Sequence, residues 1–269
     1  MSYETILYEK KGGVAIVRLN RPERMNAVIE QMYVDLNDAL AVAGDDGEVR
    51  AVLLTGSSRM KDGVEKHAFC AGADLKKHDS GERTHSDKRA YILAAHESCR
   101  RLHAFAKPVI AAVNGPARGA GVEMALCADF ILMADTATVA FTETGLGTFV
   151  GGGATYHLPK LVGLARAKEL VYTGRVIDGP EAVELGMAIA SWPVAELEKR
   201  AMELAGTLAA KAPFSLELAK RRLQQPATLD LESVLHLEAE GILACMDTED
   251  WHEGIRSFAE KRAPVFKGK

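Results

Sequence analysis

The 269-residue chain lacks the features that mark membrane, secreted and nucleic-acid-binding proteins. No apolar run reaches the roughly 18 residues that a membrane-spanning helix requires. The first residues, MSYETILYEKKGG, contain neither the apolar core of a signal peptide nor an arginine-rich presequence. The formal net charge of −4 argues against a basic surface for nucleic acid or membrane. We therefore expect a cytoplasmic protein that binds neither a membrane nor a nucleic acid.

Patterns that bind metals or nucleotides are also missing. The four cysteines, at positions 70, 99, 127 and 245, form no CxxC pair, and the eight histidines show no HExxH spacing. The chain has no GxGxxG after a strand and no GxxxxGK[ST]. These observations argue against a zinc site, a disulfide framework and a dinucleotide or P-loop site. We expect reduced, mostly buried thiols, with no metal and no separate cofactor.

Short apolar runs separated by turns predict an α/β fold. With 48% hydrophobic and 26% charged residues, the chain has enough apolar material for a sizeable core. β-branched runs bounded by turn residues predict strands, and apolar residues spaced by three or four predict helices. These elements alternate with short connections, as in βαβ-like units. The predicted strands are 14–19, 49–55, 109–113, 130–133 and 138–141, and the predicted helices between them are 29–43 and 91–105.

After Gly153 the pattern becomes helical. Helical spacing is found at 158–172, 179–185, 194–212, 211–225 and 229–246, and a last helix precedes Pro264. We therefore divide the chain into an α/β core, residues 1–200, and a helical C-terminal region, residues 201–269. The apolar side chains of this region cover either the core or a neighbouring subunit, which favours an oligomer.

One stretch between the strands is expected to form a turn around a ligand. The run AFCAGADL, residues 68–75, is typical of a strand that ends at Cys70 and breaks into small residues. The polar residues 76–90 that follow are expected to form a mobile loop beside this turn.

Two glutamates interrupt apolar or glycine-rich runs, where a carboxylate is unusual. Glu123 follows the turn Gly119-Ala120-Gly121, at the start of an apolar helix predicted at 122–127. Glu143 precedes the glycine-rich residues 145–153. A turn so poor in side chains leaves backbone N–H groups open to a ligand. Isolated glutamates are most often exposed loop residues, but two acids in these surroundings favour acid–base chemistry on a carbonyl compound.

Sequence landmarks in a fixed order connect these glutamates to a known family. They are LNRPERMNAV (19–28), VRAVLLTGS (49–57), AFCAGADLKK (68–77), KPVIAAVNGPARGAGVEMALCAD (107–129), FTETGLGTFVGGGATYHLPKLVG (141–163), LVYTGRVIDGPEAVELGMA (170–188) and TEDWHEGIRSFAEKRAPVFKG (248–268). In their order and spacing, the chain resembles the crotonase, or enoyl-CoA hydratase/isomerase, superfamily almost from end to end. The resemblance implies stacked ββα units that form a spiral, followed by helices used to build a homotrimer or homohexamer.

The resemblance also implies an activity. The substrate would be an acyl-CoA thioester, and Glu123 and Glu143 match the two glutamates of the hydratases. Those acids act on one water, since one carboxylate accepts its proton while the other acid protonates the α carbon. The thioester oxygen would lie between the backbone N–H groups of Ala73 and Ala120, which stabilise a developing enolate. Gly151 matches a glycine whose backbone lies beside the water. The implied reaction is the hydration of a trans-2-enoyl-CoA, as in fatty acid metabolism.

Further matches concern the binding of coenzyme A. The residues that match the CoA-binding segment, or a basic residue near the CoA phosphates, are Ala71, Ala73, Asp74, Leu75, Lys76 and Arg24. Departures from the family pattern lie near the second acid. Thr142 and Val150 stand where relatives have proline, and Gly145 adds flexibility. These residues would shape the acyl pocket, so they leave the substrate open.

Several alternatives remain open. One is Δ3/Δ2 enoyl-CoA isomerisation, in which a glutamate near Glu143 shuttles the proton, but the retention of Glu123 favours the hydratase. Another is hydrolysis or retro-aldol cleavage of a carbon–carbon bond in a cyclic or aromatic acyl-CoA. A non-catalytic or RNA-binding relative is disfavoured by the acid pair and the acidic composition. Cys70 has no assignable activating histidine, and His67 and His157 are expected to be structural.

Overall fold

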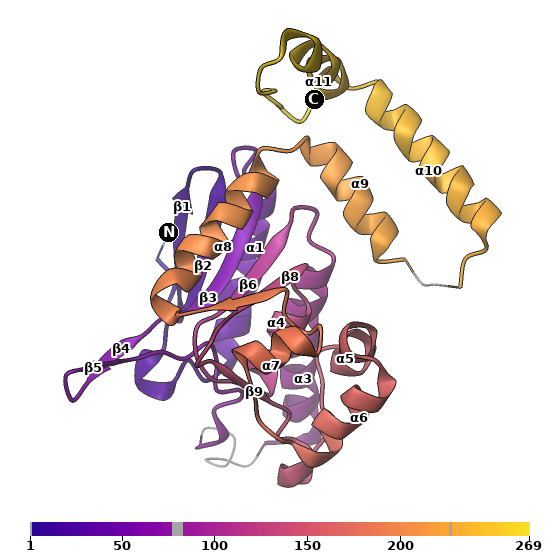
Figure 1. Cartoon of the computed structure of the whole chain (residues 1–269). Helices are drawn as coiled ribbons and strands as arrows, with labels where there is room; N and C mark the ends of the chain where they lie inside the picture. The colour runs from indigo at the N-terminus through magenta and orange to yellow at the C-terminus, as the bar shows by residue number, and fades with distance from the viewer. Residues whose placement is uncertain (1, 77–82, 226–227) are drawn as a thin grey trace.

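The computed structural model describes residues 2–76, 83–225 and 228–269, and Figure 1 shows them arranged around a large sheet. Six strands form this sheet in the order β1-β2-β3-β6-β8-β11. β1 is antiparallel to β2, and all other neighbours are parallel. The strands are β1 (Ile6–Lys11), β2 (Val14–Leu19), β3 (Ala51–Gly56), β6 (Val109–Val113), β8 (Phe130–Ala134) and β11 (Ala190–Trp192).

Shorter strands stand outside this sheet. A three-stranded sheet has the order β10-β9-β7, and a two-stranded hairpin joins β4 to β5. Their bounds are β4 (Arg59–Lys61), β5 (Val64–Lys66), β7 (Ala117–Arg118), β9 (Thr138–Ala140) and β10 (Ile177–Asp178).

Successive passes of the chain add strands to both sheets. β6 is followed by β7 and then by helix α4 (Ala120–Leu126), and β8 is likewise followed by β9. Cys70 pairs with Ala117 in an isolated bridge, so the segment after β3 lies beside β7. This repetition confirms the predicted fold of stacked ββα units. It also brings the turn after Cys70 next to the turn that begins α4.

Burial on both faces holds the large sheet in place. Every residue of β3 and β6 is buried, as predicted for central parallel strands. Helix α1 (Glu30–Asp45) packs on β1 and β2, while α8 (Val194–Ala209) packs mainly on β3, β6 and β8. Figure 1 shows α1 and α8 on opposite faces of the sheet. A packed core therefore fixes the strands that lead to both glutamates.

Helix α3 begins earlier than the sequence predicts. It covers His85–His103, so residues 85–90 of the predicted loop 76–90 are helical. The Thr84 hydroxyl accepts a hydrogen bond from the Asp87 N–H, and the Asp87 carboxylate accepts one from the Thr84 N–H. This capping box stabilises a polar first turn that hydrophobic spacing does not detect. Residues 77–82 of the predicted loop lie outside the described residues.

Two further predictions are wrong for local reasons. The single helix predicted at 158–172 is two helices, α5 (Ala154–Val162) and α6 (Leu164–Thr173), because Gly163 adopts a φ of 77° between them. The strand predicted to end at Cys70 forms only the isolated bridge. The polar run before it contains the β4–β5 hairpin.

The C-terminal helices extend away from the sheets, as Figure 1 shows. These helices are α9 (Pro213–Leu223), α10 (Leu231–Met246) and α11 (Glu249–Glu260), whereas α7 (Gly179–Glu184) precedes β11 and packs beside it. Within the described residues, neither α9 nor α10 contains a buried position. The boundary that we propose at residue 200 falls inside α8. In the part of the chain that is described, no helix is long and apolar enough to cross a bilayer.

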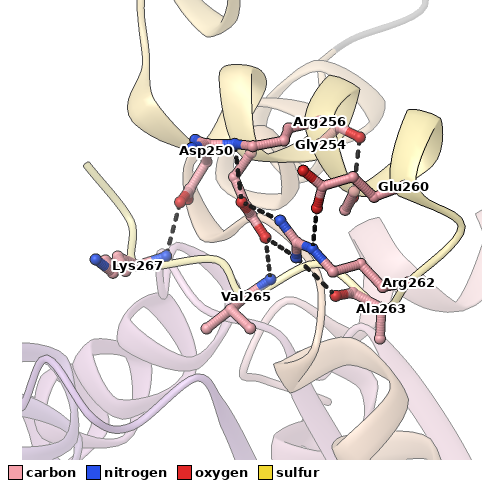
Figure 2. Close-up of polar contacts among 10 residues, drawn as sticks. Asp250, Gly254, Arg256, Glu260, Arg262, Ala263, Val265 and Lys267 are labelled. Atoms are coloured by element: carbon pink, nitrogen blue, oxygen red, sulfur yellow. Dashed lines mark hydrogen bonds and ion pairs between the residues drawn. The ribbon is translucent and has the colours of Figure 1, made fainter.

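Polar contacts fold the C-terminal tail back on α11, as Figure 2 shows. The Asp250 carboxylate accepts hydrogen bonds from the N–H groups of Lys267 and Gly268, at 2.7 and 2.8 Å. Arg262 pairs with Glu260 at 2.6 Å. The tail therefore holds α11 in a defined orientation while Phe258 stays 87% exposed.

A buried amide side chain holds the turn that precedes the candidate site. Asn26 is fully buried, and its side-chain amide donates to the carbonyls of Ser57 and Ala68, at 3.0 and 2.8 Å. Its side-chain oxygen accepts from the Arg21 N–H at 2.9 Å. The Ala71 N–H donates a hydrogen bond to the Met25 carbonyl in the same turn, at 3.0 Å. Asn26 thus links three segments that reach the site.

Replacing Asn26 by alanine should lower the free energy of unfolding by about 2–4 kcal/mol, because buried backbone groups lose their partners. Asn37→Ala is the control. The Asn37 side-chain oxygen is buried without a hydrogen-bond partner among the described residues, so its removal should cost less than about 1 kcal/mol. Denaturant unfolding followed by circular dichroism measures both variants. Equal losses would contradict the role assigned to Asn26.

Candidate active site

A cavity of about 560 Å³ brings both predicted acids together. Its wall is formed by the turn after Cys70, the start of α4, one face of α3 and the glycine-rich stretch after β9, together with Tyr33 of α1 and Thr155 near the start of the helix that follows the glycine-rich stretch. The predicted site residues that line it are Ala71, Ala73, Leu75, Ala120, Glu123, Glu143 and Gly151.

Two turns meet at unusually short range on one side of this cavity. The Arg118 N–H donates to the Cys70 carbonyl at 2.9 Å. A Cβ atom at Gly121 would lie 2.3 Å from the same carbonyl oxygen, so no other residue fits there. This contact sets the first turn of α4 directly against the segment that follows Cys70.

The contact leaves two backbone N–H groups available at the cavity wall. The Val28 N–H donates a hydrogen bond to the Gly72 carbonyl, and the Asp74 N–H donates one to the Val28 carbonyl. Because backbone N–H groups alternate in direction along an extended segment, the Ala73 N–H points away from Val28. Ala120 is the first residue of α4, and its N–H has no intrahelical acceptor. Neither N–H has a backbone acceptor among the described residues. Both residues line the cavity.

Glu123 is a buried carboxyl group held by one backbone donor. It lies in the first turn of α4 with 8% of its surface exposed. Its Oε1 accepts a hydrogen bond from the Gly151 N–H at 2.6 Å. Burial raises the pKa of Glu123 to about 7, and the charge of Glu143 adds to this rise while the Gly151 bond opposes it. Near neutral pH, the protonated and the ionised form of Glu123 are therefore both populated.

Glu143 reaches the same cavity from the loop after β9. It is also 8% exposed, and its Oε2 is buried with no hydrogen-bond partner among the described residues. Burial raises its pKa as well. An unpaired buried carboxyl oxygen is costly unless a ligand or water satisfies it. The arrangement suits a polar molecule bound between the two acids.

Other predicted residues lie outside this cavity. Arg24 and Lys76 are exposed, and the Asp74 carboxylate pairs with Arg21 at 3.1 Å. Cys70 is fully buried, and desolvation raises the pKa of its thiol to about 12, so it is no thiolate nucleophile at neutral pH. His157 lines a separate cavity of about 460 Å³.

The sequence predictions miss two tyrosines and a histidine that line the cavity. They are Tyr33 on α1, and Tyr91 and His96 on α3. The helical spacing of Ile92, Ala95 and Cys99 places His96 on the same face of α3, and that spacing is the signal that could have found it.

Comparisons with known proteins agree with this architecture. The family model described as Enoyl-CoA hydratase/isomerase matches residues 9–269. The crotonyl-CoA hydratase of Syntrophomonas wolfei is 34% identical over 269 residues, which are 100% of both chains. The short-chain-enoyl-CoA hydratase of Clostridium acetobutylicum is 33% identical over 262 residues, which are 97% of each chain.

A solved structure gives the same result. The crystal structure of the enoyl-CoA hydratase from Bacillus anthracis is 34% identical, with a TM-score of 0.92 over 99% of this chain and 100% of that chain. The likeness therefore extends over the core and the C-terminal helices alike. From the family model, the full-length relatives and this structure, we conclude that the chain belongs to the enoyl-CoA hydratase/isomerase family.

Proposed function

We propose that this protein hydrates a trans-2-enoyl-CoA to the 3-hydroxyacyl-CoA. The observation that carries the proposal is the pair of buried acids, Glu123 and Glu143, in one cavity with two available backbone N–H groups. The relatives named as hydratases of crotonyl-CoA and short-chain enoyl-CoA favour a short acyl chain. The proposed setting is fatty acid metabolism in the cytoplasm, with coenzyme A as part of the substrate.

The two backbone N–H groups have a role in this reaction. When water adds to C3, negative charge develops on the thioester oxygen as an enolate. The N–H groups of Ala73 and Ala120 would bind that oxygen, and removing one such donor typically costs about 3 kcal/mol of transition-state stabilisation. Leu75 at the cavity wall would contact the thiol arm of coenzyme A. Ala71 would contact the thiol arm within the cavity. Arg24, Asp74 and Lys76 lie outside the cavity, and we propose that they contact other parts of coenzyme A.

The acids supply and remove the protons. Because burial raises the pKa of both, one carboxyl can stay protonated while the other is ionised near neutral pH. The ionised carboxylate takes a proton from water as the water oxygen bonds to C3. The protonated carboxyl delivers its proton to C2. The pair holds one proton before and after the reaction, so it is ready for the next turnover.

Removal of either acid tests this mechanism. Glu123→Gln and Glu143→Gln should each lower the kcat for crotonyl-CoA hydration by about 10²- to 10⁴-fold, because glutamine neither accepts nor delivers the proton. The double variant should lose much less than the product of the two losses, because both acids act on one water. The loss of the enoyl thioester's ultraviolet absorbance gives the rates. Calorimetry with butyryl-CoA should show affinities within a few-fold of wild type.

Glu184→Gln, at an exposed carboxylate on α7, is the matched control and should leave kcat unchanged. Full activity in Glu123→Gln, with activity lost in Glu143→Gln, would favour the Δ3/Δ2 isomerase instead. Full activity in both acid variants would refute the reaction class.

The raised pKa of Glu123 also predicts how stability depends on pH. The folded protein holds this proton up to about pH 7, whereas the unfolded chain releases it near the ordinary value of 4.5. Wild type should therefore lose stability relative to Glu123→Gln as the pH rises from 4.5 to 7. The difference should approach about 3 kcal/mol above pH 7 and vanish near pH 4.5. Urea unfolding of both proteins across this range measures it, and a constant difference would contradict the burial argument.

The C-terminal helices support a homotrimer or homohexamer. On α10 and α11, large apolar side chains stay exposed in the single chain, including Leu231 at 69%, Ile242 at 60% and Phe258 at 87%. Apolar area of this kind is usually covered by another subunit. We infer that residues 201–269 form the subunit contact.

Light scattering tests this assembly. The wild-type mass should be three or six times 29.0 kDa. Ile242→Glu with Phe258→Glu should shift it toward the monomer, because burying two carboxylates at a subunit contact is costly. Met60→Glu, on the exposed β4 strand, is the control and should keep the wild-type mass. A monomeric wild type at micromolar concentration would contradict the proposal.

A further inference from the structure

One side chain of the cavity has no place in the paired-acid mechanism. His96 lies on α3, one helical turn beyond Ile92, and both line the cavity. Ala95 and Cys99 on the same helix are buried, so His96 stands where the buried face of α3 opens to the cavity. Among the described residues, no hydrogen bond reaches its ring. A half-buried imidazole that faces a cavity without a protein partner is suited to a polar ligand or a water.

The imidazole lies close to the first acid. A Cβ atom at Gly151 would lie 3.4 Å from His96 Nε2, 3.3 Å from Glu123 Oε1 and 3.5 Å from Glu123 Oε2. One point above the glycine is therefore within reach of the imidazole and of both carboxyl oxygens. That point is only one bond length from the Gly151 Cα, so a water oxygen must lie beyond it. Because glycine has no Cβ, the room beyond the point stays open, and a water there faces both the imidazole and the carboxyl group.

We propose that His96 is a third group that holds the reacting water, which lies above Gly151 between His96 Nε2 and the Glu123 carboxylate. This inference rests on the proposed hydration. In this arrangement, the water donates one hydrogen bond to the carboxylate and a second hydrogen bond to the lone pair of Nε2. Its own lone pair is then free to point at C3. When the C3–O bond forms, one O–H bond breaks and its proton passes to the acid pair, while His96 neither gains nor loses a proton.

The arrangement gives Gly151 a second function besides its N–H bond to Glu123. Any side chain at this position would take up part of the room that the water needs between His96 and Glu123. The φ of Gly151 lies outside the left-handed region, so alanine is compatible with its backbone. Gly151→Ala is therefore a variant that should fold and fill the space, and it probes the water without changing either side chain.

Three variants test the proposal. His96→Leu removes the acceptor and should lower kcat for crotonyl-CoA by about 10- to 100-fold, the loss expected for one good hydrogen bond to a reacting molecule. His96→Gln keeps an acceptor of similar reach and should recover kcat to within about fivefold of wild type. Gly151→Ala should also lower kcat. In all three, KM and the calorimetric affinity for butyryl-CoA should stay within about threefold of wild type, because bound butyryl-CoA needs no water at C3.

Different outcomes separate this proposal from the proposed function. A wild-type protein that hydrates no short-chain enoyl-CoA overturns both. An active wild type with unchanged kcat in His96→Leu overturns the role of His96 alone. Equal losses in His96→Leu and His96→Gln, with wild-type melting temperatures, mean that the imidazole acts by shape, which also overturns it. A crystal structure of the wild type should show an ordered water within hydrogen-bond distance of both His96 Nε2 and Glu123, and its absence contradicts the proposal.

Discussion

The close contact between two backbone turns is the constraint on which the site depends. The Cys70 carbonyl accepts the Arg118 N–H and lies where a side chain at Gly121 would have to be. This contact sets the N–H groups of Ala73 and Ala120 on one wall of the cavity, and Glu123 follows within the same helical turn. β3 and β6 are neighbours in a sheet buried on both faces, so the turns that follow them cannot move apart without disturbing the core.

The packing that creates this contact also raises the pKa values of the two buried acids. Only 8% of the surface of Glu123 and of Glu143 is exposed to bulk solvent, and burial is the largest cause of the raised pKa of each. Buried carboxyl groups of this kind reduce the stability of a folded protein at any pH at which they are ionised. A single hydrogen bond does not offset the free energy that is lost when the charge leaves water. A reaction that uses one carboxyl group to accept a proton and another to donate one needs carboxyl groups whose pKa values are raised in this way. Local stability is therefore lower where the two acids have the pKa values that the proposed reaction would require.

Strands and site residues that stand out through their own local sequence could be predicted from the sequence alone. The strands 14–19 and 109–113 have the predicted bounds because uninterrupted apolar runs specify them. Both acids were identifiable because a carboxylate inside an apolar or glycine-rich run is exceptional. β7 and β10 could not be predicted, since two-residue strands exist only through their pairing with β9. His96 was missed because helical spacing places it on the inner face of α3 but does not show which cavity that face lines.

The C-terminal region is attached to the core at a point remote from the acids. The Lys220 ammonium lies 2.7 Å from the Asp129 carboxylate, and both side chains are mostly buried. The same carboxylate accepts the N–H of Val109, where β6 begins. The site, in contrast, lies beyond the other end of β6, past Val113. A force on α9 from subunit contacts would thus act on the start of the strand, while the packed sheet holds its far end. This separation would let the exposed apolar helices serve the proposed assembly without disturbing the distances on which the proposed acid pair depends.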